Sequence, residues 1–256
     1  MLLSITESCS MGCTHCMNNA VEREDTNMTW ECFKASIDFF NRYGGLELII
    51  SGGEPTEHPE WLSMLKYALL NARGSTGTNT CHITLTTNGM NLVNDKDLQS
   101  YLLINMQKHH NFDIQITNVK EYYPIQPDFS GSFFNCGRVF VCREIEAMYP
   151  IGRAKTNNLP WKSKCSKCFN IRSSVRTYKD INLATISLAL HNKFCTPRIN
   201  YDGTISLGES SLCPRVGSIL DDHDVLVENI CGFKCSGCDI INKNLPLEYR
   251  QAIGED

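Results

Sequence analysis

The first half of the chain alternates between short strand-like runs and longer helical patterns, which restricts the fold more than any other feature. The strand-like runs are residues 2–6, 46–50, 82–87, 113–117 and 139–142. Between the first four, apolar residues recur at helical spacing in stretches that begin after Thr29, at Pro59 and at Asp95. This alternation predicts an α/β fold, with a parallel sheet and helices outside it. Periodicity alone leaves open whether the sheet is doubly wound or a barrel.

The pattern loosens after residue 122, where proline and glycine interrupt it more often. We expect a further strand at residues 147–151 and a polar linker at residues 157–164. Residues 198–207 are predicted to form a hairpin, because Asp202-Gly203 is a strong turn signal between two strand-like runs.

Composition excludes several classes of protein. The net charge of the 256 residues is −4 and no basic tract is present, so a nucleic-acid partner is not expected. No stretch is apolar and long enough for a membrane span, and the N-terminus lacks the pattern of a signal peptide. We therefore expect a cytoplasmic protein. In that reducing compartment, the 14 cysteines point to metal or redox chemistry rather than to disulfides.

Three cysteines follow the first predicted strand in the spacing Cys9-x3-Cys13-x2-Cys16. Three thiolates on one loop can ligate three irons of a cubane cluster and leave the fourth iron open. The alternative is a zinc knuckle, with His15 as the fourth ligand.

A second motif accompanies this loop. Gly52-Gly53-Glu54 ends the second predicted strand, with Pro55 and the His58-Pro59 pair beside it. Together the two motifs resemble the radical S-adenosylmethionine (SAM) superfamily, and the resemblance covers roughly residues 1–155. It implies a partial (βα)6 barrel, a [4Fe–4S] cluster on the three cysteines, and SAM bound at the open iron. Reductive cleavage of SAM would then provide a 5′-deoxyadenosyl radical that abstracts hydrogen from a substrate.

The resemblance also implies residues that bind SAM. His15 takes the usually aromatic position before the last cysteine. Glu54 is expected to accept a hydrogen bond from the amino group of SAM, or else to cap a helix. Arg153, in a Gly-Arg-Ala stretch, is expected to pair with the SAM carboxylate, or else to form a surface salt bridge. The remaining candidates are Gly52 and Gly53, which allow close backbone approach, Asn88 of a Thr-Asn-Gly stretch that otherwise forms a plain turn, and Gln115 and Thr117 near the ribose.

The C-terminal cysteines resemble the Twitch and SPASM extensions of this superfamily. The resemblance implies an auxiliary [4Fe–4S] cluster on Cys195, Cys213, Cys235 and Cys238, in a domain of residues 161–256 that follows a barrel domain of residues 1–160. The alternative is a structural zinc ribbon on the same cysteines. Cys231 competes as a ligand, and the roles of Cys165 and Cys168 stay open.

Several functions fit these features. The leading interpretation is oxidative modification of a peptide, with flavodoxin or ferredoxin as electron donor. A dehydrogenase of a small alcohol or sugar is the first alternative, which an expected lack of a leader-binding domain favours slightly. A glycyl-radical activase fits less well, because residues 17–28 contain no cysteine. A non-catalytic zinc-binding module is the alternative from another class. No residue identifies the substrate or a catalytic base.

Overall fold

The computed structural model describes residues 1–43, 46–74, 81–144, 151–160, 197–208, 211, 213 and 215–232. Their strands form one eight-stranded sheet in the order β5-β4-β3-β2-β1-β6-β7-β8. The strands are β1 (Leu2–Thr6), β2 (Glu47–Gly52), β3 (His82–Thr87), β4 (Phe112–Thr117), β5 (Val139–Cys142), β6 (Pro197–Ile199), β7 (Thr204–Leu207) and β8 (Arg215–Ser218).

Four helices lie along the first half of the chain: α1 (Trp30–Tyr43), α2 (Trp61–Asn71), α3 (Met90–Val93) and α4 (Lys96–Lys108). The shorter elements that follow are the 3-10 helices η1 (Pro55–Glu57) and η2 (Ser132–Asn135), and α5 (Gly152–Thr156). Near the end of the described chain lies α8 (His223–Gly232). None of the described helices is long and apolar enough to cross a membrane.

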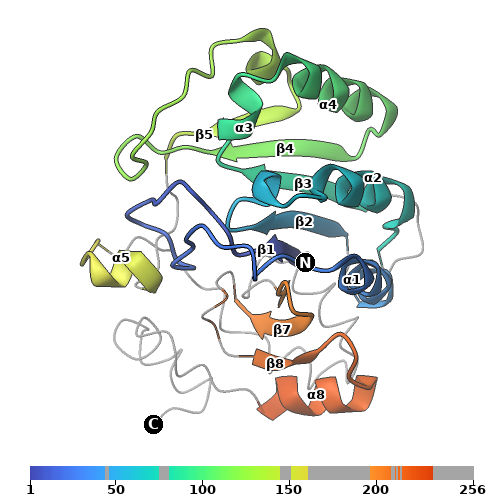
Figure 1. Ribbon diagram of the computed structural model, residues 1–256. Coiled ribbons are helices and arrows are strands. Elements are labelled where there is room, and N and C mark those ends of the chain that lie inside the picture. Colours follow the sequence, from blue (N-terminus) through green and yellow to red (C-terminus); the bar gives the residue numbers. More distant parts are fainter. Residues whose placement is uncertain are drawn as a thin grey trace, which may run out of the picture.

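The strand order decides between the two sheet architectures that the sequence left open. Strands β1 to β5 are parallel and each lies beside its neighbour in sequence. Because crossovers between parallel strands are right-handed, connections that all run in one direction place their helices on one face. Figure 1 shows α1, α2 and α4 on the same side of the sheet. The sheet is therefore wound in one direction, as in a partial barrel, and is not doubly wound.

The two faces of the sheet differ in polarity. Alternate positions such as Leu3, Ile50 and Leu85 are buried in the main hydrophobic core together with residues of the helices. On β1 and its partner β6, the intervening positions Ser4 and Arg198 are buried as well, although they are polar. The face without the helices is therefore where polar side chains collect.

Most predicted element positions are confirmed, and the differences are small. Strands β1, β3 and β5 have the predicted bounds, while β2 begins one residue later and ends two residues later than expected. Pro59 precedes α2 instead of standing in its first turn, since the helix begins at Trp61. Most of the strand expected at residues 147–151 lies outside the described residues, and Ile151 itself is the N-cap of α5.

The predicted hairpin is present as β6 and β7, but its turn is longer than two residues. The Asn200 N–H donates to the Thr204 carbonyl (2.8 Å), and the Gly203 N–H donates to the Asn200 carbonyl (2.9 Å). Gly203 has a φ of +79°, which glycine adopts without a Cβ penalty. The hairpin joins the main sheet because β6 pairs in parallel with β1. The domain boundary near residue 160 stays a prediction.

Candidate functional site

The cysteine loop, residues 7–26, leaves the C-terminal end of β1. Figure 1 shows it in blue at the edge of the sheet toward which the arrowheads of β2 and β4 point, with α5 at the same edge. The loop folds back on itself, because the Cys9 N–H donates to the Val21 carbonyl and the Glu7 N–H to the Thr26 carbonyl, each at 3.2 Å. It carries three free thiols, of which those of Cys9 and Cys13 are buried and that of Cys16 is partly exposed.

The buried thiols are held neutral by the apolar surroundings. Burial raises the pKa of Cys9 to about 12 and that of Cys13 to about 12. The Met11 N–H, close to Cys9, and the Arg153 guanidinium, close to Cys13, act in the opposite direction. A metal centre that binds these sulfurs must displace their protons, which couples metal binding to pH. The site therefore combines sulfur ligands with a nearby positive charge.

The donor set fits an iron–sulfur cluster. Thiolates are the ligands that such clusters take, and each cysteine binds a separate iron. A zinc knuckle instead needs Cys9, Cys13, Cys16 and His15 on one ion. Within the described ranges, no three His, Cys, Asp or Glu side chains come close enough to ligate a single metal ion.

His15 lies between two aromatic rings that were not predicted as site residues. Its ring centroid is 5.3 Å from that of Tyr122 and 5.2 Å from that of Tyr123. Burial lowers the pKa of His15 to about 4, with a further contribution from Arg153, so the imidazole is neutral at pH 7. Its Nδ1 atom is buried and has no hydrogen-bond partner among the described residues. A polar ligand at this place would satisfy that nitrogen.

The Gly52-Gly53 pair is required by close contact with the end of β1 and the start of the cysteine loop. The Gly53 N–H donates to the Thr6 carbonyl at 2.7 Å. A Cβ on Gly52 would overlap the Thr6 carbonyl oxygen, and one on Gly53 would overlap the Ser8 carbonyl oxygen. Only glycine allows this approach. The expected approach of these glycines to SAM stays a prediction, whereas their approach to Thr6 of β1 and Ser8 of the loop is a property of the fold.

Glu54 is buried, with 1 % of its surface exposed, and its carboxylate accepts four hydrogen bonds. Oε1 accepts from the Thr56 N–H (3.1 Å), the Thr56 hydroxyl (2.6 Å) and the Thr87 hydroxyl (2.6 Å), and Oε2 accepts from the Asn88 N–H (2.6 Å). Burial raises the pKa of Glu54, and these donors oppose that shift. The alternative expectation, that Glu54 caps a helix, is confirmed, because Glu54 is the N-cap of η1. Its bond to SAM stays a prediction.

The Thr87-Asn88-Gly89 stretch forms a turn that leads from β3 into α3. The Thr87 hydroxyl accepts a hydrogen bond from the Gly89 N–H at 3.0 Å, and the Asn88 side-chain oxygen accepts one from the Met90 N–H at 2.9 Å. Gly89 has a φ of +80°. This stretch therefore forms the turn that the sequence also allowed, and the turn places Asn88 beside Glu54.

Gln115 and Thr117 lie on β4, on the same face of the sheet and partly exposed. The Gln115 amide donates to Cys142 Sγ at 3.4 Å. The Thr117 hydroxyl accepts a hydrogen bond from the Tyr123 hydroxyl at 3.0 Å, which connects β4 to the ring beside His15. Thr117 is thus connected to the cysteine loop through Tyr123, whereas Gln115 contacts β5, and the contact of both with the ribose stays a prediction.

Arg153 holds the cysteine loop from a segment that lies far along the chain. Its Nε donates to the Cys13 carbonyl (2.8 Å), its Nη1 donates to the Ala20 carbonyl (2.8 Å), and its N–H donates to the Cys16 carbonyl (2.9 Å). A Cβ on Gly152 would approach the Cys16 carbonyl oxygen to 2.6 Å, so this glycine also serves the contact. Pairing with a SAM carboxylate stays a prediction.

Of the four predicted auxiliary ligands, only Cys213 lies within the described residues. It is partly exposed, and a Cβ on Gly208 would collide with its sulfur. Cys231 lies in α8. The other cysteines of this region, namely Cys165, Cys168, Cys195, Cys235 and Cys238, are outside the described residues, so the auxiliary site stays a prediction.

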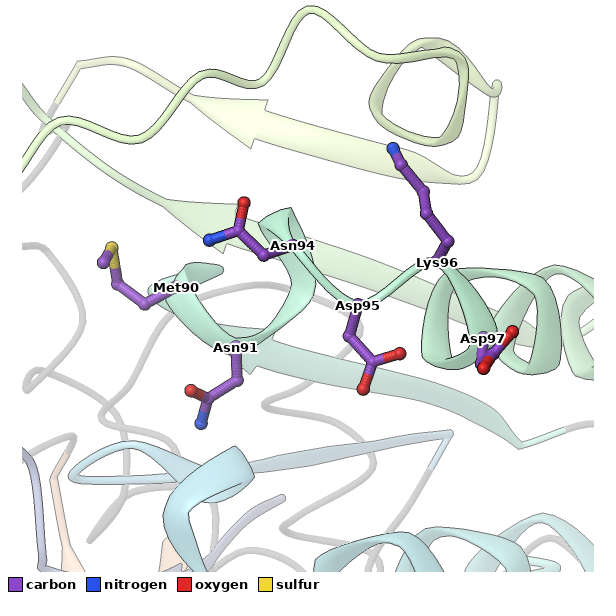
Figure 2. Close-up of a pocket in the computed structure, with 6 residues that line it drawn as sticks. All are labelled: Met90, Asn91, Asn94, Asp95, Lys96 and Asp97. Carbon is purple, nitrogen blue, oxygen red and sulfur yellow. The ribbon is translucent and has the colours of Figure 1, made fainter.

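A cleft of about 530 Å³ lies at the junction of α3 and α4, and Met90 in its lining also packs against the hydrophobic cluster that contains Cys9 and Cys13. Figure 2 shows its lining residues, which include Met90, Asn91, Asp95 and Lys96. None of the residues predicted to bind SAM lines it. The cleft is widely open, and we assign it no part in the chemistry.

Two comparisons relate this arrangement to known proteins. The model of the radical SAM superfamily matches residues 3–125, just under half of the chain. This segment contains the cysteine loop, the glycine motif and the polar residues of β3 and β4. The superfamily uses a [4Fe–4S] cluster and SAM, so these two predicted cofactors are confirmed at that level. Comparison with the curated proteins finds no match.

Solved structures show the same fold. BtrN in complex with AdoMet and 2-DOIA is similar with a TM-score of 0.55 and 11 % identity, over 92 % of this chain and 86 % of that chain. SuiB of Streptococcus suis bound to the precursor peptide SuiA gives 0.55 and 14 %, over 93 % and 68 %. AnSMEcpe with bound AdoMet and the Cp18Cys peptide gives 0.54 and 15 %, over 96 % and 84 %. At these identities the likeness establishes the fold alone.

Proposed function

We propose that this chain, whose residues 3–125 form a radical SAM domain, modifies a peptide oxidatively by removing hydrogen from an unactivated carbon. When bound, the [4Fe–4S] cluster and SAM would supply a 5′-deoxyadenosyl radical for that abstraction. The observation that carries the proposal is the interlocking of the cysteine loop with the Gly-Gly-Glu motif. The Glu54 N–H donates to the Ser8 carbonyl at 2.8 Å, next to Cys9.

The chain's own residues would provide binding, orientation and exclusion of water. Cys9, Cys13 and Cys16 would ligate the cluster, and Arg153 holds their loop in place through the Cys13 and Ala20 carbonyls. The neutral His15, with its unpaired nitrogen, is suited to a polar group of SAM. Burial of the thiols would keep water from the reactive species.

A peptide substrate is supported by two of the structural relatives. SuiB is seen with the precursor peptide SuiA, and AnSMEcpe with the Cp18Cys peptide. The second candidate is a dehydrogenase of a small alcohol or sugar. BtrN, which is seen with 2-DOIA, supports a small-molecule ligand at the same fold.

The oxidative outcome depends on the C-terminal cysteines. Cys195, Cys213, Cys235 and Cys238 would hold an auxiliary [4Fe–4S] cluster in a domain of residues 161–256, which would accept an electron from the substrate radical. Flavodoxin or ferredoxin would reduce the first cluster. Oxygen-sensitive clusters and reduced thiols suit the cytoplasm, which is part of the proposal.

The first experiment is anaerobic reconstitution, followed by counting of iron and sulfide. We expect about eight irons in the wild type and about four in a Cys9/Cys13/Cys16→Ala variant, since each cluster contains four. With SAM and dithionite, the wild type should form 5′-deoxyadenosine and the variant should not. Cys136→Ala, a partly exposed cysteine outside both sets, is the matched control. If the protein binds zinc but no iron and forms no 5′-deoxyadenosine, the proposal is wrong and the non-catalytic zinc-binding module is the better interpretation.

A second experiment separates the two substrate classes. The protein is incubated with SAM, dithionite and either peptides or the low-molecular-mass fraction, both from cells grown on deuterated medium. Deuterium in 5′-deoxyadenosine, measured by mass spectrometry, identifies the fraction that loses hydrogen. Labelling by the peptide fraction supports the proposal, and labelling only by the small molecules supports a dehydrogenase.

A further inference from the structure

Arg198 on β6 is the largest fully buried side chain of the described chain, with 1 % of its surface exposed. Two of its hydrogen bonds go to neutral side chains. Nη2 donates to the Ser4 hydroxyl at 2.7 Å, and Nε donates to the Asn200 side-chain oxygen at 2.9 Å. Arginine is not deprotonated in proteins, so this buried guanidinium stays positively charged.

A carboxylate of the cysteine loop forms an ion pair with Arg198. Glu7 Oε1 lies 3.8 Å from Nη2, which is an ion pair but is longer than a hydrogen bond. A buried charge is costly unless a close partner of opposite sign is present. Burial lowers the pKa of Arg198 to about 10, and the nearby Glu7 carboxylate, with smaller contributions from the Cys213 and Cys16 sulfurs, acts in the opposite direction. Two cysteines are thus within electrostatic reach of this guanidinium.

Asn18 explains how Arg198 comes close to both cysteines. The Asn18 side-chain oxygen accepts a hydrogen bond from Arg198 Nη1 (3.5 Å) and one from the Ser211 N–H (3.0 Å). Asn18 is two residues after Cys16, and Ser211 is two residues before Cys213. The guanidinium therefore lies at the junction between the cysteine loop and the segment that carries Cys213.

We infer that Arg198 is a positioning residue that raises the reduction potential of the iron–sulfur cluster held by Cys9, Cys13 and Cys16. The inference rests on the proposed function, because it requires that cluster. Reduction takes one electron from an external donor and makes the cluster more negative, while Arg198 gains and loses nothing. A fixed positive charge in a buried, weakly screened place favours the more negative state.

The test is a redox titration of the reconstituted full-length protein, followed by electron paramagnetic resonance. The signal of the loop's cluster is the one that disappears in the Cys9/Cys13/Cys16→Ala variant. Arg198→Met should lower the ratio of reduced to oxidised cluster about tenfold at a fixed potential, which is about 59 mV for one electron. Arg198→Lys, which keeps the charge, should restore most of the ratio.

Glu7→Gln distinguishes an electrostatic role from a structural one. It removes the negative charge 3.8 Å from Arg198, so the potential should rise instead of falling. Opposite shifts in Arg198→Met and Glu7→Gln support the inference, and unchanged potentials or shifts in the same direction overturn it. If circular dichroism shows that Arg198→Met does not fold, the other two variants decide. A higher reduction potential in Glu7→Gln together with a wild-type potential in Arg198→Lys supports the inference, and any other pair of results overturns it.

The failure of this inference can be told apart from failure of the proposed function. A loop cluster that is present but whose potential does not respond to these variants overturns the inference alone. Absence of the loop cluster from the wild type, by iron and sulfide analysis, overturns both.

Discussion

The Thr87 hydroxyl at the end of β3 donates a 2.6 Å hydrogen bond to the carboxylate of Glu54, two residues after the end of β2. This contact joins two neighbouring strands at the edge where the cysteine loop lies. Glu54 also accepts from the Asn88 N–H on the same side and from the Thr56 N–H and hydroxyl on its own side, so its donors come from both sides of the gap between these strands. The glutamate of the glycine motif is therefore a structural element of the site, whatever it contacts in SAM.

Replacement of Glu54 by glutamine should destabilise the fold. The new amide would point a donor at the Asn88 N–H or at the two threonine hydroxyls, so at least one buried donor would be left without an acceptor. We expect a loss of about 1–3 kcal/mol in the free energy of unfolding. Urea denaturation measures it, with Glu60→Gln as the exposed control. Equal stability of the two variants would contradict the importance of this network.

Stability should fall in mild acid because of His58. Its Nδ1 accepts a hydrogen bond from the Glu60 N–H (3.0 Å), and its Nε2 lies 2.9 Å from the Met28 carbonyl, an arrangement that suits the neutral ring with a proton on Nε2. Burial lowers the pKa of His58 in the folded state. Its contribution is therefore complete above the unfolded value of about 6.5 and is lost as the pH falls from there toward the lower folded pKa.

The measurement is the free energy of unfolding between pH 7 and pH 5, in the wild type and in His58→Gln. The variant should lose part of the pH dependence, because it has no imidazole to protonate. His110→Gln, at an exposed position, is the control and should keep the wild-type slope. Identical slopes in all three proteins would show that His58 does not govern this range.

Gly53→Ala should disturb the cysteine loop. The added Cβ would meet the carbonyl oxygens of Ser8 and Glu7, which are backbone atoms that cannot rotate away. We expect a destabilisation of about 1–3 kcal/mol, which is typical of overpacking, and lower iron retention after reconstitution. Gly137→Ala is the matched control, because nothing lies within 4 Å of a Cβ at that position. Full iron content in Gly53→Ala would argue that the loop tolerates displacement.

Arg153→Gln should weaken the hold on the cysteine loop. The variant loses the donors to the Cys13 and Ala20 carbonyls, and it loses the positive charge beside Cys13. We expect at least a twofold faster loss of iron to a chelator, because a less constrained loop opens more often. Lys155→Gln, which removes an exposed charge from the same helix, should lose iron at the wild-type rate. A wild-type rate in Arg153→Gln would contradict the anchoring role.

Several parts of the fold could be predicted from local sequence. The bounds of β1, β3 and β5 follow from short apolar or β-branched runs, and the start of α4 follows from Asp95, whose carboxylate accepts from the Leu98 N–H at 2.8 Å. These features depend on residues close together in the chain, which is why propensity and spacing are sufficient. The cysteine loop and the glycine motif were found for the same reason.

Partners that are far apart in sequence could not be predicted. The turn after β3 gave no sign that the Thr87 hydroxyl and the Asn88 N–H would bond to Glu54. Nothing around Arg153 indicated that its guanidinium would meet the carbonyl of Cys13, 140 positions away. Tyr122 and Tyr123 were missed because their sequence neighbourhood resembles an ordinary loop. The signal that could have pointed to them is two consecutive tyrosines soon after β4, a strand with polar residues at alternate positions.

The sequence by itself determined which residues form strands and helices and which thiols share one loop, since both depend on spacing along the chain. Only the tertiary structure decided that the sheet is wound in one direction, that β6 lies beside β1, and that Arg198 is buried in contact with Asn18 of the cysteine loop. The reason is that strand pairing and charge burial depend on long-range contacts. Their free energy comes from groups that meet only when the chain is folded, and no local pattern records them.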